Sequence, residues 1–148
     1  MRRAGISFIC GLGLFAALAS AQQSKPNFSG KWQLNSSKSD VHSGQTSAIN
    51  LIIEQNGASI HVVRTSKTSD GRQTVTDFNC TTDGKDCDAK GTKVSLWYDG
   101  VSLVEMDIAA EVVTKNNMTL APDGKSISIT VTYISPQADA DKLVLDKT

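Results

Sequence analysis

The chain has no excess of charge of either sign. Its 148 residues carry 15 Lys and Arg against 15 Asp and Glu, and the formal net charge is 0. Nucleic-acid backbones and anionic membrane surfaces recruit proteins through clustered basic side chains, which this composition does not supply. After the first 21 residues, no apolar run approaches the roughly 18 residues that a membrane helix needs. We therefore expect neither nucleic-acid binding nor membrane insertion.

Side chains that carry acid–base or metal chemistry are also scarce. The chain holds three cysteines and two histidines, and neither His42 nor His61 lies in a nucleophile signature. We expect no catalytic residues, no metal and no cofactor, and we expect that the protein is not an enzyme.

One segment resembles the start of a calcium-binding loop. The run Asp86 to Gly91 has Asp at positions one and three and Gly at position six. Lys90 replaces the ligand at position five, and position twelve falls on Trp97 instead of Glu, so the full site cannot form. A looser calcium contact through Asp83, Asp86 and Asp88 stays open.

No segment after Ala21 shows a helical apolar period, which predicts an all-β fold. Turn signals are instead abundant. Asn-Gly and Asp-Gly pairs favour the tight turns of β-hairpins, because both residues tolerate positive φ. Five such pairs divide the chain: Asn56-Gly57, Asp70-Gly71, Asp83-Gly84, Asp99-Gly100 and Asp123-Gly124.

Apolar and polar residues alternate between these turns, as in half-buried strands. The longest alternation is Ile127, Ile129, Val131 and Tyr133. With a first strand near residues 29–35 and two strands between Gly100 and Asp123, at 101–107 and 111–120, the pattern predicts about eight strands. Consecutive hairpins form an antiparallel meander, and closure into an up-and-down β-barrel removes its exposed edges. A two-sheet sandwich is the alternative.

The N-terminus carries the one long apolar run of the chain. Arg2 and Arg3 precede apolar residues 6–18, and Ala19-Ser20-Ala21 supplies the small residues of a signal-peptidase site. A membrane helix is the competing interpretation, but the run is short for one. We expect residues 1–21 to form a signal peptide that is cut after Ala21, and residues 22–148 to form a single secreted or periplasmic domain.

Export would place Cys80 and Cys87 in an oxidising compartment. They are the two cysteines left after residue 21, and they flank the Asp83-Gly84 pair. We expect a disulfide that staples this hairpin. The alternative, two ligands of a metal site, has no further Cys and only two His to complete it.

The segment Asn27-Phe28-Ser29-Gly30-Lys31-Trp32 resembles the first strand of the calycin superfamily, the lipocalins and avidins. The likeness is greatest to small exported bacterial lipocalin-like proteins, with a Gly-Lys-Trp opening followed by Asp-Gly hairpins. It implies a cup-shaped antiparallel barrel whose closed end is plugged by Trp32. The chain has only two tryptophans and no histidine near its C-terminus, so neither biotin nor haem is implied.

The resemblance further implies that the barrel interior binds a small, largely apolar molecule, and that the polar segment 36–47 forms the loop over the open mouth. The expected lining residues are Trp32, Leu51, Tyr98, Met106 and Tyr133. The alternative is a ligand-free structural or protein-interaction module that acts through its loops, in which these residues only pack a core.

Overall fold

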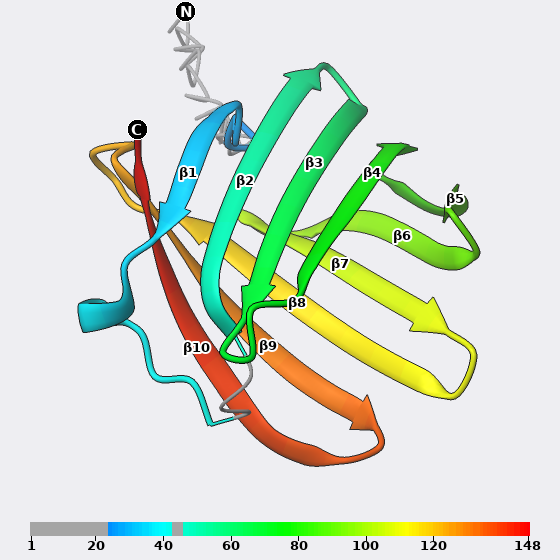
Figure 1. Cartoon of the computed structure of the whole chain (residues 1–148). Helices are drawn as coiled ribbons and strands as arrows, with labels where there is room; N and C mark the ends of the chain where they lie inside the picture. The colour runs from blue at the N-terminus through cyan, green and yellow to red at the C-terminus, as the bar shows by residue number, and fades with distance from the viewer. Residues whose placement is uncertain (1–23, 43–45) are drawn as a thin grey trace, which may run out of the picture.

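The computed structural model describes residues 24–42 and 46–148, which form one antiparallel sheet of ten strands (Figure 1). The expected signal peptide, residues 1–21, lies outside the described residues. The all-β fold is confirmed, but the expected count of about eight strands is wrong. The strands are β1 (Gly30–Leu34), β2 (Thr46–Asn56), β3 (Ser59–Thr68), β4 (Gln73–Thr81), β5 (Asp83–Ala89), β6 (Thr92–Asp99), β7 (Ser102–Ala109), β8 (Val112–Leu120), β9 (Ser126–Ser135) and β10 (Ala138–Lys147).

The strands follow one another around a nearly closed barrel in the order β4-β3-β2-β1-β10-β9-β8-β7-β6-β5. Every hydrogen-bonded pair is antiparallel, and β1 joins the two ends of the meander by pairing with both β2 and β10. The sheet curves round on itself, so that β2 and β3 face β7, β8 and β9 across the interior (Figure 1). The predicted up-and-down barrel is thus confirmed, and the two-sheet sandwich is wrong.

Four of the five marked turns lie between consecutive strands, as predicted. Asp83-Gly84 is the exception, because β5 already begins at Asp83 and the chain reverses at Thr82. Gly84 has a φ of 77° and lies where the pairing of β5 with β6 shifts register, between Asp83 and Asp86. This glycine is therefore part of a β-bulge at the beginning of an edge strand, where the backbone needs positive φ.

A short 3-10 helix, η1 (Ser36–Lys38), follows β1. The N–H groups of Asp40 and Lys142 each donate to the other's carbonyl oxygen, which holds this part of the connection against β10. The expected loop 36–47 is therefore partly ordered by backbone bonds, and β2 takes its last two residues. Residues 43–45 lie outside the described part of the chain.

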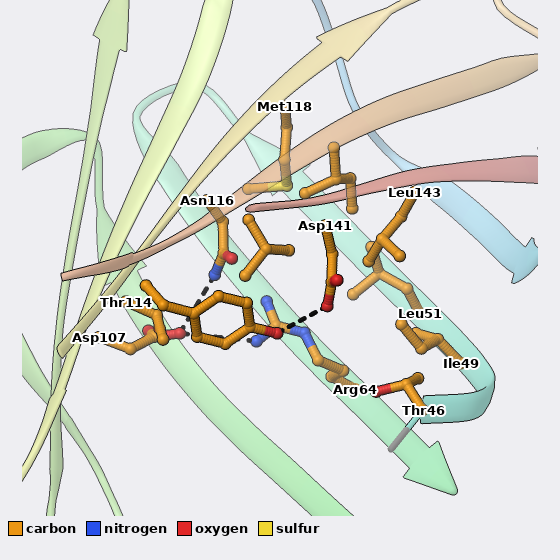
Figure 2. Close-up of a pocket in the computed structure, with 13 residues that line it drawn as sticks. Thr46, Ile49, Leu51, Arg64, Asp107, Thr114, Asn116, Met118, Asp141 and Leu143 are labelled. Atoms are coloured by element: carbon orange, nitrogen blue, oxygen red, sulfur yellow. Dashed lines mark hydrogen bonds and ion pairs between the residues drawn. The ribbon is translucent and has the colours of Figure 1, made fainter. Parts of the chain in front are cut away.

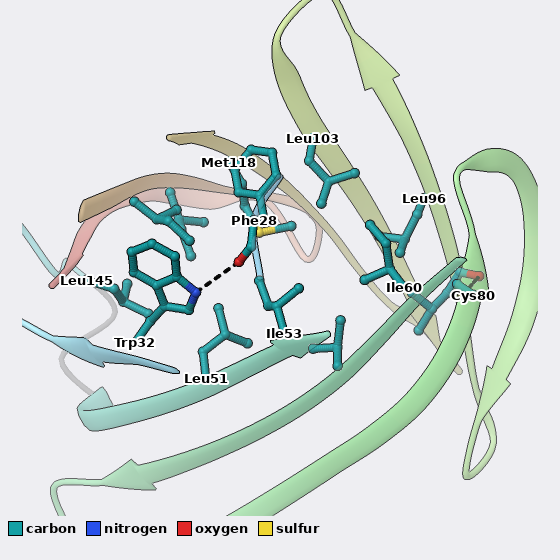
Figure 3. Close-up of a cluster of buried hydrophobic side chains, with 14 of the residues drawn as sticks. Phe28, Trp32, Leu51, Ile53, Ile60, Cys80, Leu96, Leu103, Met118 and Leu145 are labelled. Carbon is teal, nitrogen blue, oxygen red and sulfur yellow. Dashed lines mark hydrogen bonds between the residues drawn. The ribbon is translucent and has the colours of Figure 1, made fainter. Parts of the chain in front are cut away.

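The core lies at the β1 end of the barrel interior, around Trp32 (Figure 3). Its side chain is 2% exposed, and its indole N–H donates to the carbonyl oxygen of Phe28 over 3.1 Å. Leu51 and Leu145 flank it on the paired strands β2 and β10. Gly30 completes the motif: its φ is 151°, and a Cβ there would lie 3.3 Å from the Trp32 ring. The Gly-x-Trp spacing thus lets the indole fold back over the strand.

Cys80 and Cys87 lie at disulfide distance, with their Cα atoms 5.6 Å apart. They join β4 to β5, the two edge strands at which the sheet order begins and ends. The cross-link therefore spans the place where the barrel has no backbone ladder in the described residues. It also replaces part of the edge protection that a full ladder would give.

Replacing Cys80 and Cys87 together by alanine is expected to lower the free energy of unfolding by about 2–3 kcal/mol, because a closed loop this short removes that much chain entropy from the unfolded state. Urea denaturation of the oxidised wild type and the double variant measures the difference. Equal midpoints, or two free thiols in the oxidised protein, would contradict the cross-link.

Candidate functional site: an interior cavity with a polar end

A cavity of about 210 Å³ lies inside the barrel (Figure 2). Its walls come from six strands, β2, β3, β7, β8, β9 and β10, so distant parts of the sequence meet around one space. The lining residues are Thr46, Ile49, Leu51, Arg64, Asp107, Thr114, Asn116, Met118, Ile129, Val131, Tyr133, Asp141 and Leu143. The side chains at the inward positions of each strand produce this lining, because alternate residues face the interior.

One wall of the cavity is apolar. It is formed by the side chains of Ile49, Leu51, Met118, Ile129, Val131 and Leu143. Leu51 and Met118 also belong to the core cluster around Trp32 (Figure 3). The core thus forms the floor of the cavity, and an apolar molecule bound there would leave water for a hydrocarbon surface.

Arg64 is the cation at the other end of the cavity. It reaches across the interior from β3 to Glu105 on β7, and its Nη2 donates to both carboxylate oxygens, at 2.6 and 2.8 Å. The Glu105 side chain is 1% exposed. Burial alone would lower the pKa of Arg64, but the charges of Glu105 and Asp107 raise it, so the guanidinium stays charged.

Asp107 lies two residues along β7 from Glu105 and lines the cavity. Its Oδ2 is 3.7 Å from Nη1 of Arg64 and accepts a hydrogen bond from the amide of Asn116 over 3.2 Å. Its Oδ1 is buried and has no hydrogen-bond partner among the described residues. Burial and the negative charge of Glu105 raise the pKa of Asp107 to about 7, although Arg64 and Asn116 oppose the shift.

Asp107→Asn is expected to flatten the pH dependence of stability. The pKa of Asp107 rises from 3.8 to about 7 in the fold, so the folded protein keeps a proton that the unfolded chain releases as the pH rises through this window. Between about pH 4 and pH 8, the free energy of unfolding of wild type should therefore fall by about 2 kcal/mol relative to that of the variant. A pKa shift of this size in an isolated group would give ~4 kcal/mol. We expect less because Asp107 titrates together with Glu105.

Urea denaturation across this pH range measures the effect. Asp99→Asn, at the exposed end of β6, is the control, and its stability should depend on pH as that of wild type does. If the free energies of unfolding of wild type and Asp107→Asn changed with pH in the same way, Asp107 would have an ordinary pKa and the prediction would be wrong.

Asp141 is the second carboxylate of the lining and is buried, with 2% exposure. Its Oδ2 accepts a hydrogen bond from the phenol hydroxyl of Tyr133 over 2.7 Å, and its Oδ1 accepts one from the backbone N–H of His42 over 2.6 Å. These bonds tie the connection between β1 and β2 to the cavity wall. The polar end is therefore built from strands β3, β7, β8, β9 and β10 together with that connection.

Two of the five expected lining residues, Leu51 and Tyr133, are among the residues that line the cavity. Trp32 lies in the core below it. Tyr98 borders a separate hollow, where its hydroxyl donates to the carbonyl oxygen of Pro26 over 2.8 Å. Met106 is half-buried and lies between Glu105 and Asp107 on β7, whose side chains take the inward positions.

At the polar end, sequence reasoning found Tyr133 but missed the charged and amide side chains, namely Arg64, Glu105, Asp107, Asn116 and Asp141. One signal in the sequence pointed to Arg64. It follows Ile60 and Val62 at every second position of β3, and these two side chains are buried in the interior. In the described residues, no group of three or more His, Cys, Asp or Glu side chains has the geometry of a metal site. Nor does any helix in that part of the chain have the length and apolarity to cross a membrane.

Comparison with solved structures shows that the fold is similar to the β-barrels of fatty-acid-binding proteins and of the fluorescent protein UnaG. No protein-family model and no curated protein matches the sequence. The likeness therefore rests on structure alone, and it defines the fold.

Three solved structures illustrate the likeness. The fluorescent protein UnaG has a TM-score of 0.59 at 17% identity, over 82% of this chain and 97% of that one. Fatty-acid-binding protein 1 of Echinococcus granulosus has a TM-score of 0.57 at 14% identity, with 82% and 97% covered. The Schistosoma mansoni fatty-acid-binding protein, solved with arachidonic acid, has a TM-score of 0.56 at 12% identity, with 82% and 96% covered.

Proposed function

We propose that the protein is an exported carrier that binds a small molecule with an apolar body inside its barrel, and that it is not an enzyme. The observation that carries this proposal is the cavity of about 210 Å³, with its continuous apolar wall above the Trp32 core. The fatty-acid-binding proteins of similar fold, one of them solved with arachidonic acid, support the same kind of function.

The size of the cavity limits its ligand. An engineered apolar cavity of about 150 Å³ accepts benzene, whereas pockets for drug-sized ligands begin near 300 Å³. At about 210 Å³ the cavity of this protein lies between these values. We therefore propose a ligand shorter than a long-chain fatty acid, with one polar end that meets the Arg64 side of the cavity.

Native mass spectrometry of the protein purified gently from its own host tests the proposal. Wild type is expected to carry an extra mass that disappears on denaturation. Val131→Phe fills part of the cavity and should abolish that mass. Thr130→Phe, the same addition on the adjacent exposed position of β9, should retain it. A bare mass for wild type, or a ligand retained by Val131→Phe, would contradict binding inside the barrel.

Export is the second part of the proposal. It is supported by the Arg-rich start, the apolar run and the small residues before Gln22, and by a cysteine pair at disulfide distance. Sequencing the N-terminus of the mature protein should give Gln22 as its first residue. A protein that begins at Met1 would contradict export.

A ligand-free interaction module is the second candidate function. Its support is a set of exposed apolar side chains near the strand ends on β7, β8 and β9: Ile108, Val112 and Ile134. If this candidate is correct, the protein purified from its host should have a bare mass but should co-purify with a protein partner, which substitution of these three residues by serine should release.

A further inference from the structure

The polar end of the cavity contains more negative than positive groups. Among the lining residues Arg64 is the one cation, whereas Asp107 and Asp141 are both carboxylates. A third carboxylate, Glu105, is buried directly behind Arg64. The balance of these side chains decides which ligand head group the cavity can accept.

Arg64 is already neutralised from within the protein. Glu105 holds its Nη2 with both oxygens, and Asp107 lies 3.7 Å from Nη1. A bound carboxylate would have to displace these partners or share the guanidinium with them. It would also lie beside Asp107, in an interior where like charges repel more strongly than in water. The cavity therefore disfavours an anionic head group.

Acceptor oxygens, in contrast, are available at this end. Asp107 contributes a carboxylate with one oxygen that no described group satisfies, and a ligand donor could reach this carboxylate after a rotation about χ2. Asp141 accepts hydrogen bonds from the Tyr133 hydroxyl and from the His42 backbone N–H. A group that donates hydrogen bonds and brings positive charge would complement the Asp107 carboxylate.

We propose that the ligand of this cavity is a small amphipathic amine, whose ammonium group lies beside Asp107 and whose apolar body lies against Leu51, Met118 and Leu143. This inference rests on the proposed function, because it names the ligand class of the same cavity. It sets this chain apart from binding of a fatty-acid carboxylate in spite of the shared fold. The separation comes from Glu105 and Asp107, which occupy the guanidinium that a carboxylate would need.

The test is calorimetric titration with three probes of equal chain length, octylamine, octan-1-ol and octanoate. It is carried out on the full mature protein at about pH 8, where carboxylates are ionised and an alkyl ammonium keeps its charge. Octylamine is expected to bind at least tenfold more tightly than either of the others. In Asp107→Asn that preference should fall at least fivefold, whereas the charge-matched Asp99→Asn, at the exposed end of β6 and remote from the lining, should keep it.

The outcomes separate the two proposals. If octanoate or octan-1-ol binds wild type as tightly as octylamine, the amine inference is overturned while the carrier proposal stands. If Asp107→Asn keeps the full preference, Asp107 is not the recognising group and the inference is also overturned. If none of the three probes binds, the carrier proposal itself fails. The wild-type series decides the head-group question even if Asp107→Asn does not fold.

Discussion

Glu105→Gln lowers the free energy of unfolding by about 3 kcal/mol in our account, because the substitution leaves the guanidinium of Arg64 buried with only part of its compensation. Glu105 is almost fully buried, accepts both bonds from Arg64, and accepts a further bond from the amide of Asn116 at 3.3 Å. Breaking a buried pair costs about 3–5 kcal/mol. We place the effect at the lower end because Asp107 stays beside Arg64.

The double variant Arg64→Met with Glu105→Leu is the informative control. It replaces both charges by apolar side chains of similar length, which is often neutral and should restore stability to within about 1 kcal/mol of wild type. Glu111→Gln, at the exposed turn between β7 and β8, should leave stability unchanged. A loss below ~1 kcal/mol for Glu105→Gln would mean that the pair is solvated and not part of the barrel interior.

Trp32→Ala should destabilise the protein by about 3–5 kcal/mol, the usual cost of removing a large aromatic side chain from a core. Trp32 packs among Phe28, Leu51 and Leu145 and donates its indole N–H to a backbone carbonyl oxygen (Figure 3). The variant therefore loses apolar burial and leaves the carbonyl of Phe28 without that donor. Urea denaturation measures the change.

Trp97→Ala is the matched control for this prediction. Trp97 lies on β6 between the buried Leu96 and the half-buried Tyr98, and it is itself only half-buried. Its loss should cost less than half as much as that of Trp32. Equal losses for the two variants, or a loss below ~1 kcal/mol for Trp32→Ala, would count against Trp32 as the plug of the barrel floor.

The fold was largely predictable because its signals are local. Asn56-Gly57 and Asp99-Gly100 mark reversals through φ preferences of single residues, and alternation at Ile127 to Tyr133 marks a strand with one buried face. The hairpin expected at Asp83-Gly84 does not form, because β4 and β5 are the two edge strands of the sheet and β5 pairs with β6 instead. The sequence of β5 is polar and does not alternate, and one neighbouring strand and the cross-link to Cys80 are enough to hold it.

The candidate site was predictable in part of its apolar wall and at Tyr133, but not in its charged groups. Leu51 follows from alternation, but a charged residue in a strand is ordinarily read as facing solvent. Arg64 faces inward because Glu105, 41 residues further along the chain, meets it across the barrel. The local sequence does not mark a pairing of that separation, and the alternation that Arg64 shares with Ile60 and Val62 is the local sign that it faces inward. On β7, three successive residues are buried: Leu103, Val104 and Glu105. The burial pattern therefore does not show which of the two sets of alternate side chains faces the interior.

The central claim is that a small molecule binds inside the barrel, and methyl NMR during titration with octan-1-ol tests it most directly. A neutral probe leaves the head-group question aside. Our account predicts that the shifts concentrate on methyl groups of the lining, in particular those of Leu51, Met118 and Leu143. Exposed methyl groups such as those of Ile52 and Ile134 should stay in place. Shifts confined to the exposed methyl groups, with the lining unchanged at saturation, would contradict an interior binding site.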